Sequence, residues 1–340
     1  MKELRIAVVG CGRIAQVYNE IFQKYPENIK VIAAVDIQIE RAQAFAENFK
    51  GCVALTDYKD LGNLNIDIVH ILTPHFLHAE QSSKLLEMGY HVLQEKPIAI
   101  ELSDAKALCE LANKVDKKLG VISQNRYITG IQKLKKLFDS GELGKLKGVS
   151  SLLNWWRPPS YYECDWKGHW ETEGGGVVID QAIHSLDLVR YIAGEEVRSV
   201  HGFIDKRVIT QIEVEDVANA LIEFKSGARY IFNACNYFFE NTPIRIDFYF
   251  ERGTAFLHGE QVEITMDGKS HIYKNESPQE ILETLSYWGA NHEKQVIEFY
   301  ENIDNPDYNF VTPEDATKSL EIVRAIYKSS QKGEKVIFNH

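Results

Sequence analysis

The first third of the chain alternates short apolar runs with segments of helical periodicity. Apolar runs of strand length occupy residues 4–9, 30–36, 67–73, 90–94 and 119–123. Between them, apolar residues recur every three to four positions, which predicts helices over 12–25, 40–49, 78–88 and 104–115. Strands that alternate with helices imply parallel pairing through right-handed crossovers, and continuously apolar strands fit a sheet covered on both faces. We therefore expect an α/β domain over residues 1–122.

The pattern changes after residue 123. The spacing predicts a helix over 132–138, a strand over 145–156 and a helix that starts at Gly174-Gly175-Gly176 and runs to about residue 192. Residues 197–273 then read as successive strands with few helices between them, which favours an antiparallel sheet. Two helices close the chain, and Thr312 and Pro313 are the expected N-cap and first residue of the last one. Residues 123–340 therefore form an expected second domain.

Composition narrows the class of protein without indicating its chemistry. The 340 residues carry 38 Lys+Arg and 49 Asp+Glu, so the formal net charge of −11 argues against a general nucleic-acid binder. No apolar run approaches the roughly 20 residues that span a bilayer. The five cysteines include no Cys-x-x-Cys pair, which indicates free thiols in a reducing compartment and no structural zinc site. We expect a soluble, cytoplasmic protein that binds neither membranes nor nucleic acid.

A glycine-rich turn follows the first predicted strand. Gly10-Cys11-Gly12-Arg13-Ile14-Ala15 fits the G-x-G-x-x-G/A pattern, in which the glycines permit a tight turn and a close approach to a pyrophosphate. The helix that follows offers free N–H groups to the phosphates. Asp36 ends the second strand, where a carboxylate can bind both ribose hydroxyls and would repel a 2′-phosphate, so the pattern favours NAD over NADP. The alternative is a tight turn of another α/β fold, with Asp36 as a helix cap.

Two further sets of residues are candidates for catalysis. Lys96 follows the strand over 90–94, on the side where parallel sheets bind ligands, although a solvent-exposed lysine is the alternative. Asp180 and His184 are spaced i, i+4 and project from the same face of the predicted helix, and histidine is suited to removing a hydroxyl proton. The three glycines before them let the chain pass close to a ligand. A metal pair or a core histidine would explain the same spacing, but no further metal ligands are evident nearby.

The motifs together resemble the Gfo/Idh/MocA oxidoreductases over essentially the whole chain. The resemblance rests on the glycine-rich turn, Thr73-Pro74-His75, Glu95-Lys96-Pro97 and Asp180-x-x-x-His184. It implies an N-terminal Rossmann domain for NAD and a C-terminal α/β domain built on a large, open, mainly antiparallel sheet. That sheet commonly supports dimers or tetramers in the family, so the resemblance implies a homodimer or homotetramer.

The resemblance also implies roles for individual residues. Lys96, Asp180 and His184 would be the catalytic set: His184 as the general base, Lys96 hydrogen-bonded to the reacting hydroxyl, and Asp180 orienting the substrate or tuning His184. Hydride would pass from the hydroxyl-bearing carbon to the nicotinamide. The implied cofactor contacts outside the glycine-rich turn and Asp36 are Thr73, His75, Glu95, Lys96 and Gln124. Many members carry Asn where this chain has His75.

The segments 123–127, 166–170 and 181–184 and the aromatic-rich loop 156–162 are similar to one branch of the family, the UDP-N-acetylglucosaminuronate 3-dehydrogenases. On that resemblance Arg157 would pair with a carboxylate or phosphate, and Tyr161 and Tyr162 would stack on a sugar or base. Lys167 stands where the branch suggests Arg. The alternative is that this aromatic loop forms a subunit interface.

The expected function is oxidation of a sugar or nucleotide-sugar hydroxyl by NAD, and the 3-hydroxyl of a UDP-sugar acid is one candidate. Dehydrogenation of inositol or a free sugar, NAD-dependent glycoside cleavage, and non-catalytic sensing of a dinucleotide are the alternatives. A sensor has no need for a base, so the presence of Lys96, Asp180 and His184 argues against sensing.

Overall fold

The computed structural model describes residues 2–275, 290–308 and 310–338, and the chain divides into two compact units. The first unit comprises Met1–Gln124 and Pro278–Thr317, and the second comprises Asn125–Ser277 and Lys318–His340. The expected boundary at residue 122 lies close to the first crossing between the units. The described residues 290–308 and 310–317 group with the first unit.

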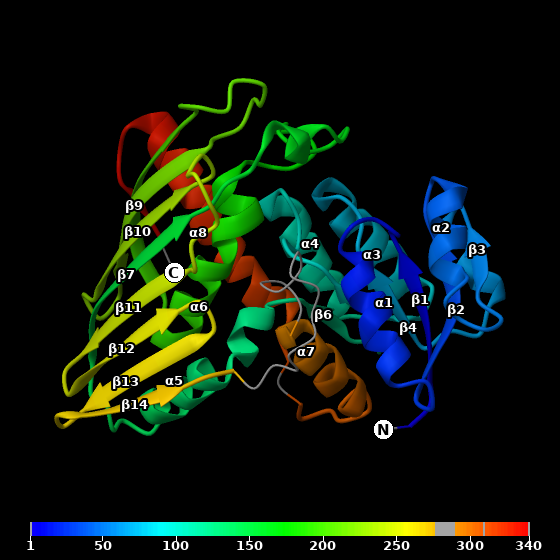
Figure 1. Cartoon of the computed structure of the whole chain (residues 1–340), viewed down its shortest axis with the longest axis horizontal. Coiled ribbons are helices and arrows are strands. Elements are labelled where there is room, and N and C mark those ends of the chain that lie inside the picture. The colour runs from blue at the N-terminus through cyan, green and yellow to red at the C-terminus, as the bar shows by residue number, and fades with distance from the viewer. Residues whose placement is uncertain (1, 276–289, 309, 339–340) are drawn as a thin grey trace. The chain divides into compact units, whose positions relative to one another are not determined.

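The first unit is built on a six-stranded sheet in which every pairing is parallel (Figure 1). The strand order is β3-β2-β1-β4-β5-β6. The strands are β1 (Leu4–Val9), β2 (Ile29–Val35), β3 (Val53–Leu55), β4 (Ile68–Ile71), β5 (His91–Gln94) and β6 (Leu119–Val121). The connecting helices are α1 (Ala15–Lys24), α2 (Ile39–Ala46), α3 (His78–Glu87) and α4 (Leu102–Ala112). The predicted parallel α/β sheet is confirmed, and β3, which was not predicted, is only three residues long and partly exposed.

Helix α7 (Ala290–Glu301) completes the core of this first unit from far along the chain. Val296, Phe299 and Tyr300 are buried in the same apolar cluster as the residues of β1 and α1. A Cβ on Gly120 would lie 2.9 Å from the Phe299 ring, so glycine at this position of β6 makes room for α7. On the same helix, the Gln295 side chain accepts from the Ser123 N–H and donates to the Val121 carbonyl, both at 2.9 Å. Gln295 thereby bonds backbone groups at the end of β6, the edge strand of the sheet, that no neighbouring strand pairs.

The second unit contains a nine-stranded sheet with the order β14-β13-β12-β11-β7-β10-β9-β8-β15. Only β7 and β10 pair in parallel, so the expected mainly antiparallel sheet is confirmed. The first strands are β7 (Leu146–Asn154), β8 (Val197–Asp205), β9 (Val217–Phe224), β10 (Arg229–Cys235) and β11 (Arg245–Phe250). The others are β12 (Gly253–His258), β13 (Gln261–Met266), β14 (Lys269–Tyr273) and β15 (Val336–Ile337).

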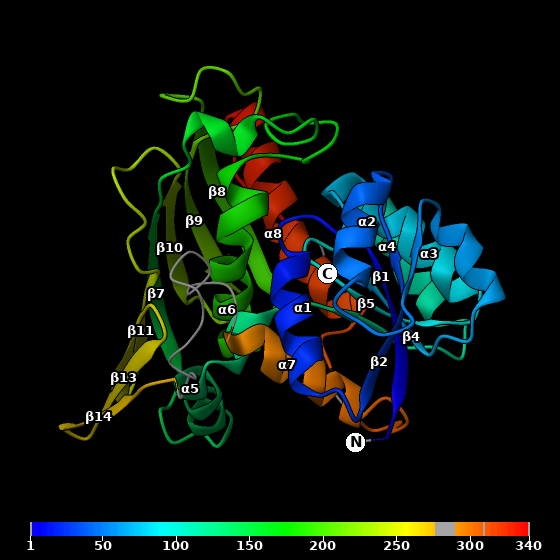
Figure 2. The same ribbon diagram turned by 45° about the vertical axis from the view of Figure 1, so that its right-hand side comes forward.

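Helices cover one face of this sheet. Figures 1 and 2 show α5 (Thr129–Asp139) and α6 (Ile183–Ala193) on the same side of the strands. Helix α8 (Pro313–Lys332) begins as predicted, because the Thr312 hydroxyl accepts from the Asp315 N–H at 3.2 Å. Among the described residues, no helix has both the length and the apolar character needed to cross a bilayer.

Candidate functional site

The glycine-rich turn joins β1 to α1 in the geometry that a dinucleotide pyrophosphate requires. Gly10 has a φ of +96°, and a Cβ there would lie 2.7 Å from the carbonyl carbon of Leu72. A Cβ on Gly12 would meet no atom within 4 Å, so the chain is open on this side. Within the described residues, nothing accepts from the N–H groups of Gly12 or Ile14. These two donors at the start of α1 fit phosphate oxygens.

Asp36 lies beside this turn, as predicted. Its carboxylate accepts from the backbone N–H groups of Cys11 and Gln38, both at 2.9 Å. Arg13 is exposed, and Ile14 is half-buried. The structure therefore brings Gly10, Gly12 and Asp36 together at the carboxyl ends of β1 and β2, and the residues fit an NAD molecule whose adenosine ribose approaches the carboxylate.

The carboxyl ends of β4 and β5 are tied together by a buried histidine that the sequence did not single out. The ring nitrogens of His78 lie 2.8 Å from the carbonyl oxygen of Thr73 and 2.7 Å from that of Pro97. Thr73 also donates its hydroxyl to Gln81 at 2.7 Å. His75 is buried, and its ring centroid lies 5.8 Å from that of His78.

The turn that carries Lys96 is held by side chains on both sides. Gln94 donates its amide to the carbonyls of Glu95, Pro97 and Ile98 at 3.2, 3.0 and 2.9 Å. The Lys96–Pro97 peptide is cis, and the Lys96 side chain is half-buried. Gln124, which follows β6, is also buried, and no described group bonds its Oε1 atom.

In the second unit, the predicted helix after the three glycines begins with a π-helical turn, Val178–Ala182, before α6 starts at Ile183. Such turns are rare and are frequent at functional sites. The turn carries Asp180, and His184 lies one residue into α6, where it is half-buried. The sequence predicted the helix but had no signal for its wider first turn.

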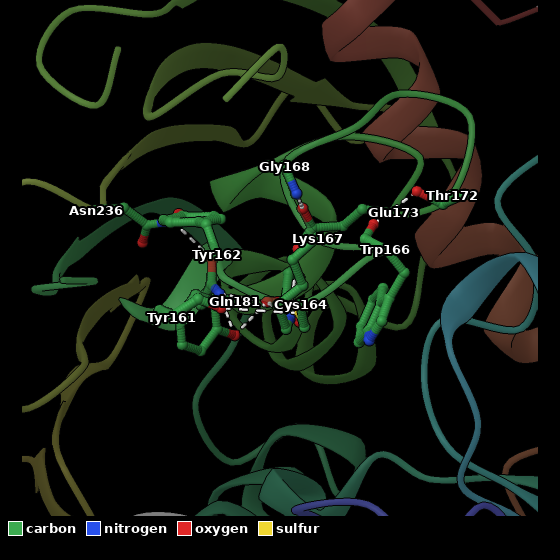
Figure 3. A network of polar contacts seen from close by, with 12 residues as sticks. Tyr161, Tyr162, Cys164, Trp166, Lys167, Gly168, Thr172, Glu173, Gln181 and Asn236 are labelled. Carbon is green, nitrogen blue, oxygen red and sulfur yellow. Dashed lines mark hydrogen bonds and ion pairs between the residues drawn. The ribbon is translucent and has the colours of Figure 1, made fainter. Parts of the chain in front are cut away.

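Asp180 is buried and its Oδ2 atom accepts three hydrogen bonds. The donors are the Tyr161 hydroxyl at 2.6 Å, the Lys167 ammonium at 2.7 Å and the Gln181 amide at 2.5 Å, and Figure 3 shows these three side chains converging. Burial, followed by the charge of Asp180, raises the pKa of the Tyr161 hydroxyl, so it remains a donor. A carboxylate bound in this way orients its neighbours and is poorly placed to take up a proton.

Lys167 links Asp180 to a second buried carboxylate, Glu173. Its ammonium lies 3.4 Å from Glu173, 4.3 Å from the Trp166 ring centroid and 4.5 Å from that of Tyr161. Burial lowers the pKa of Lys167, but Asp180 and its other neighbours outweigh it and the pKa lies well above its usual range. Burial raises the pKa of Glu173 to about 8. Lys167, the departure from the expected Arg, thus serves as the internal cation of this network.

Two of the three glycines before Asp180 make room for other parts of the second unit. A Cβ on Gly175 would lie 2.0 Å from the Tyr327 hydroxyl, and one on Gly176 would lie 1.9 Å from the carbonyl oxygen of Glu215. The Glu215 carboxylate accepts from the N–H groups of Gly176 and Val178 at 2.8 and 3.0 Å. Sequence reasoning missed Glu215, which lies 39 residues from Gly176 and has no motif around it.

Arg157 is a buried guanidinium among neutral neighbours. Its Nη1 donates to the Trp156 carbonyl at 3.0 Å and to the Asn241 side chain at 3.1 Å, and its Cζ lies 4.6 and 5.0 Å from the Trp155 and Tyr161 ring centroids. Only 4% of the residue is exposed, and Nε is buried without an acceptor. No carboxylate of the described chain pairs with it.

The neighbouring Tyr162 is half-buried, and its hydroxyl accepts from Asn236 at 3.3 Å. Asn236 also donates to Gln181 at 2.9 Å, which joins Tyr162 to the Asp180 network. The predicted catalytic residues are divided between the units: Lys96 belongs to the first, and Asp180 and His184 belong to the second. Over the described ranges of the chain, no group of three His, Cys, Asp or Glu side chains could hold a metal ion.

Known proteins with the same organisation act on several kinds of substrate. The WlbA dehydrogenase of Bordetella pertussis, solved with NADH and UDP-GlcNAcA, is 25% identical, with a TM-score of 0.84 over 100% of both chains. The D-glucoside 3-dehydrogenase of Escherichia coli is 28% identical over 66% of this chain and 68% of its own length. The myo-inositol 2-dehydrogenase of Thermotoga maritima is 29% identical over 66% of each protein.

Two family models together cover most of the chain. Residues 4–123 match the NAD-binding Rossmann fold of the oxidoreductase family, and residues 131–256 match the GFO/IDH/MocA C-terminal domain. With the parallel sheet and the glycine-rich turn, these matches confirm the family resemblance, the NAD(H)-binding fold and a dehydrogenase that acts on hydroxyl donors. This chain is a member of the Gfo/Idh/MocA family of oxidoreductases.

Proposed function

We propose that this protein uses NAD to oxidise a hydroxyl group of an anionic sugar, the best candidate being the 3-hydroxyl of a UDP-sugar acid. The first unit would bind the cofactor and the second would bind the substrate. This choice agrees with the substrate named for the WlbA dehydrogenase and differs from the neutral glucoside and inositol named for the other two relatives.

The observation that carries the proposal is the uncompensated charge of Arg157. A buried cation is costly unless an anion or a set of hydrogen bonds replaces its hydration. Two neutral acceptors and two aromatic rings satisfy only part of this guanidinium, and Nε has no acceptor. A carboxylate or phosphate of the substrate would supply the missing charge through a planar pair of hydrogen bonds.

The proposed roles of the catalytic residues follow from their settings. His184 would take the hydroxyl proton, and Lys96 would donate to the same oxygen and stabilise its developing charge. NAD, when bound, accepts the hydride from the carbon that bore the hydroxyl, leaving a carbonyl. Asp180 would orient the substrate and His184, because its three donors hold it as an acceptor.

Asp36 supports NAD over NADP. Its carboxylate is fixed at the end of β2 by the N–H groups of Cys11 and Gln38. A 2′-phosphate would bring like charges together at this position, whereas ribose hydroxyls can donate to the carboxylate. Thr73, His75 and Gln124 are the further cofactor contacts that we propose. Glu95 is 7% exposed and its carboxylate is bound within the first unit, so we assign it no direct contact with NAD.

We also propose that the protein assembles as a homodimer or homotetramer through the uncovered face of its nine-stranded sheet. Leu221 and Ile231 lie opposite each other on β9 and β10 and are 44% and 61% exposed. On the same sheet, Phe203 of β8 and Tyr249 of β11 are 57% and 42% exposed. Exposed apolar side chains grouped on one face are typical of an association surface. Light scattering should show an oligomer, and Ile231→Asp should shift it towards the monomer.

The proposed substrate class is tested with a panel of UDP-sugar acids, neutral UDP-sugars, inositols and free sugars. Reduction of NAD, followed by its nicotinamide absorbance, should be fastest with a UDP-sugar acid. Arg157→Met should then raise KM for that substrate by about 100-fold and change KM for a neutral sugar little. Activity confined to inositols would overturn the proposal, and bond cleavage without net NADH would indicate a glycosidase.

His184→Ala tests the proposed base. We expect kcat to fall by about 1,000-fold because proton transfer is lost, with NADH affinity nearly unchanged. Steady-state kinetics and titration of NADH fluorescence measure the two quantities separately. Parallel loss of NADH binding and activity would instead indicate that His184 is structural.

A further inference from the structure

Glu95, the residue before Lys96, belongs to a buried network that joins three elements of the first unit. Its Oε1 atom accepts from the Tyr18 hydroxyl of α1 at 2.8 Å and lies 3.2 Å from Nε2 of His292, on α7. Its Oε2 atom accepts from the Lys96 N–H at 3.3 Å. Glu95, Tyr18 and His292 are 7%, 0% and 2% exposed.

The network keeps Glu95 ionised despite its burial. Burial opposes ionisation, but the hydrogen bond and charge of His292, the charge of Lys96 and the Tyr18 hydroxyl together lower the pKa of Glu95 to about 2. Burial, then the charge of Glu95, raises the pKa of Tyr18 well above its usual range, so Tyr18 remains a donor. A carboxylate only accepts hydrogen bonds, so Nε2 of His292 must carry the proton between them.

Two other residues of helix α7 bond the parallel sheet, and these bonds fix the backbone that carries His292. Tyr300, two turns further along the helix, bonds its hydroxyl to Nε2 of His70 on β4. Gln295 bonds the backbone at the end of β6. Helix α7 therefore bonds β4 through Tyr300 and β6 through Gln295, and its His292 bonds Glu95.

We propose that His292 and Tyr18 are positioning residues for Lys96, acting through the Glu95 carboxylate. The carboxylate fixes the Lys96 N–H from one side, while Gln94 binds the carbonyls of Glu95 and Pro97 around it. The Lys96 side chain thus starts from a backbone held on both sides. The inference rests on the proposed function, in which Lys96 binds the reacting hydroxyl.

The first test compares His292→Ala with a matched variant on the same helix. A misplaced catalytic group can reduce rate by about 100-fold, so His292→Ala should lower kcat by about that factor and Tyr18→Phe by about tenfold, with KM for NAD little changed. His292→Gln, whose Nε2 can donate, should restore kcat to within about fivefold. Tyr300→Phe should lower thermal stability and leave kcat unchanged. Equal losses of kcat in His292→Ala and Tyr300→Phe would overturn the inference.

A double-mutant cycle shows whether His292 acts through Lys96. If it does, adding His292→Ala to Lys96→Ala should cause no further loss of kcat. Multiplying losses would place the effect of His292 elsewhere and overturn the inference. If Lys96→Ala keeps full activity, the proposed function fails; if only Lys96→Ala loses activity, the inference alone fails.

A spectroscopic readout tests the inference without any substrate. The Lys96 amine can be labelled by reductive methylation with isotope-enriched formaldehyde and assigned by the absence of its signal in Lys96→Ala. Its resonance should shift in His292→Ala and stay in place in Tyr300→Phe. An unchanged resonance in His292→Ala would overturn the inference even if no substrate were turned over.

Discussion

Glu95 in the first unit and Glu215 in the second are similar in every respect but one. Both are buried, and each carboxylate accepts hydrogen bonds from three donors, one of them a tyrosine hydroxyl, Tyr18 or Tyr327. The difference lies in the remaining donors. The other donors to Glu95 are the His292 imidazole and the backbone N–H of Lys96, whereas both other donors to Glu215 are backbone N–H groups.

That difference decides which carboxylate is ionised. Burial raises the pKa of both, yet the pKa of Glu95 falls to about 2, because His292 and Lys96 add favourable charge. The pKa of Glu215 rises to about 7, because the neutral donors only partly offset its burial. A count of hydrogen bonds therefore does not predict the charge of a buried carboxylate, and the sign of the nearest ionisable neighbour does.

The largest expected effect is a loss of stability when the surroundings of Glu215 are disturbed. Gly176→Ala would place a Cβ 1.9 Å from the Glu215 carbonyl oxygen, so the chain at one of these two positions must move. The hydrogen bonds from the N–H groups of Gly176 and Val178 to the Glu215 carboxylate must then weaken. We expect a loss of about 4 kcal/mol in the free energy of unfolding. Chemical denaturation measures it, with Gly148→Ala as control, since its Cβ would come no closer than 3.4 Å to any atom. Equal stability of the two variants would contradict the packing.

The next effect uses pH to separate the two carboxylates. The pKa of Glu215 rises from 4.5 to about 7 on folding, so the folded state binds more protons between these values. Its stabilising contribution is complete below about pH 4.5 and is lost as the pH rises through 7, a change of about 3 kcal/mol.

The measurement is thermal unfolding of Glu215→Gln and of the unchanged protein across this range. The variant should gain stability relative to the unchanged protein as the pH rises. Glu95→Gln is the control: the lowered pKa of Glu95 predicts that its contribution is lost only as the pH falls from 4.5 towards 2. A constant difference for Glu215→Gln would mean that Glu215 is ionised throughout.

The smallest expected effect is the difference in stability between variants that remove the two tyrosine hydroxyls. Tyr18 donates to an ionised carboxylate at 2.8 Å, and Tyr327 donates at 3.0 Å to one that is largely protonated at pH 6. Tyr18→Phe should therefore cost about 2 kcal/mol of stability and Tyr327→Phe about 1 kcal/mol. Denaturant unfolding at pH 6 measures both, and the reverse order would contradict the assigned charges.

Most of the fold could be predicted from the sequence, because most helices and strands bury a face whose apolar residues recur at a regular spacing. The parallel sheet, the antiparallel sheet and the two closing helices all carried such patterns. Helix α7 shows what the pattern omits. Periodicity predicts a helix near the end of the chain, but which sheet that helix covers depends on contacts with residues hundreds of positions away. The strand β3 was not predicted, because three apolar residues are too few to distinguish a strand from a loop.

The candidate site could be predicted from the sequence only where all the residues of a feature belong to one motif. Gly10, Gly12 and Asp36 come together as the turn predicts. The partners of motif residues were not readable, because His292 reaches Glu95 across 197 positions. The three glycines suggested close approach to a ligand, whereas Gly175 and Gly176 make room for Tyr327 and Glu215. A glycine in the sequence indicates that another group lies close to the backbone, but it does not indicate whether that group is a ligand or part of the protein.

The place of α7 in the first unit has a consequence for synthesis on the ribosome. Val296, Phe299 and Tyr300 belong to the core that β1 begins, so a nascent chain cannot close this core until about 300 residues have been made. Residues 125–277, which form most of the second unit, emerge earlier. The NAD-binding unit is thus the first to leave the ribosome and among the last parts to become complete, and until then its apolar surface is available to chaperones.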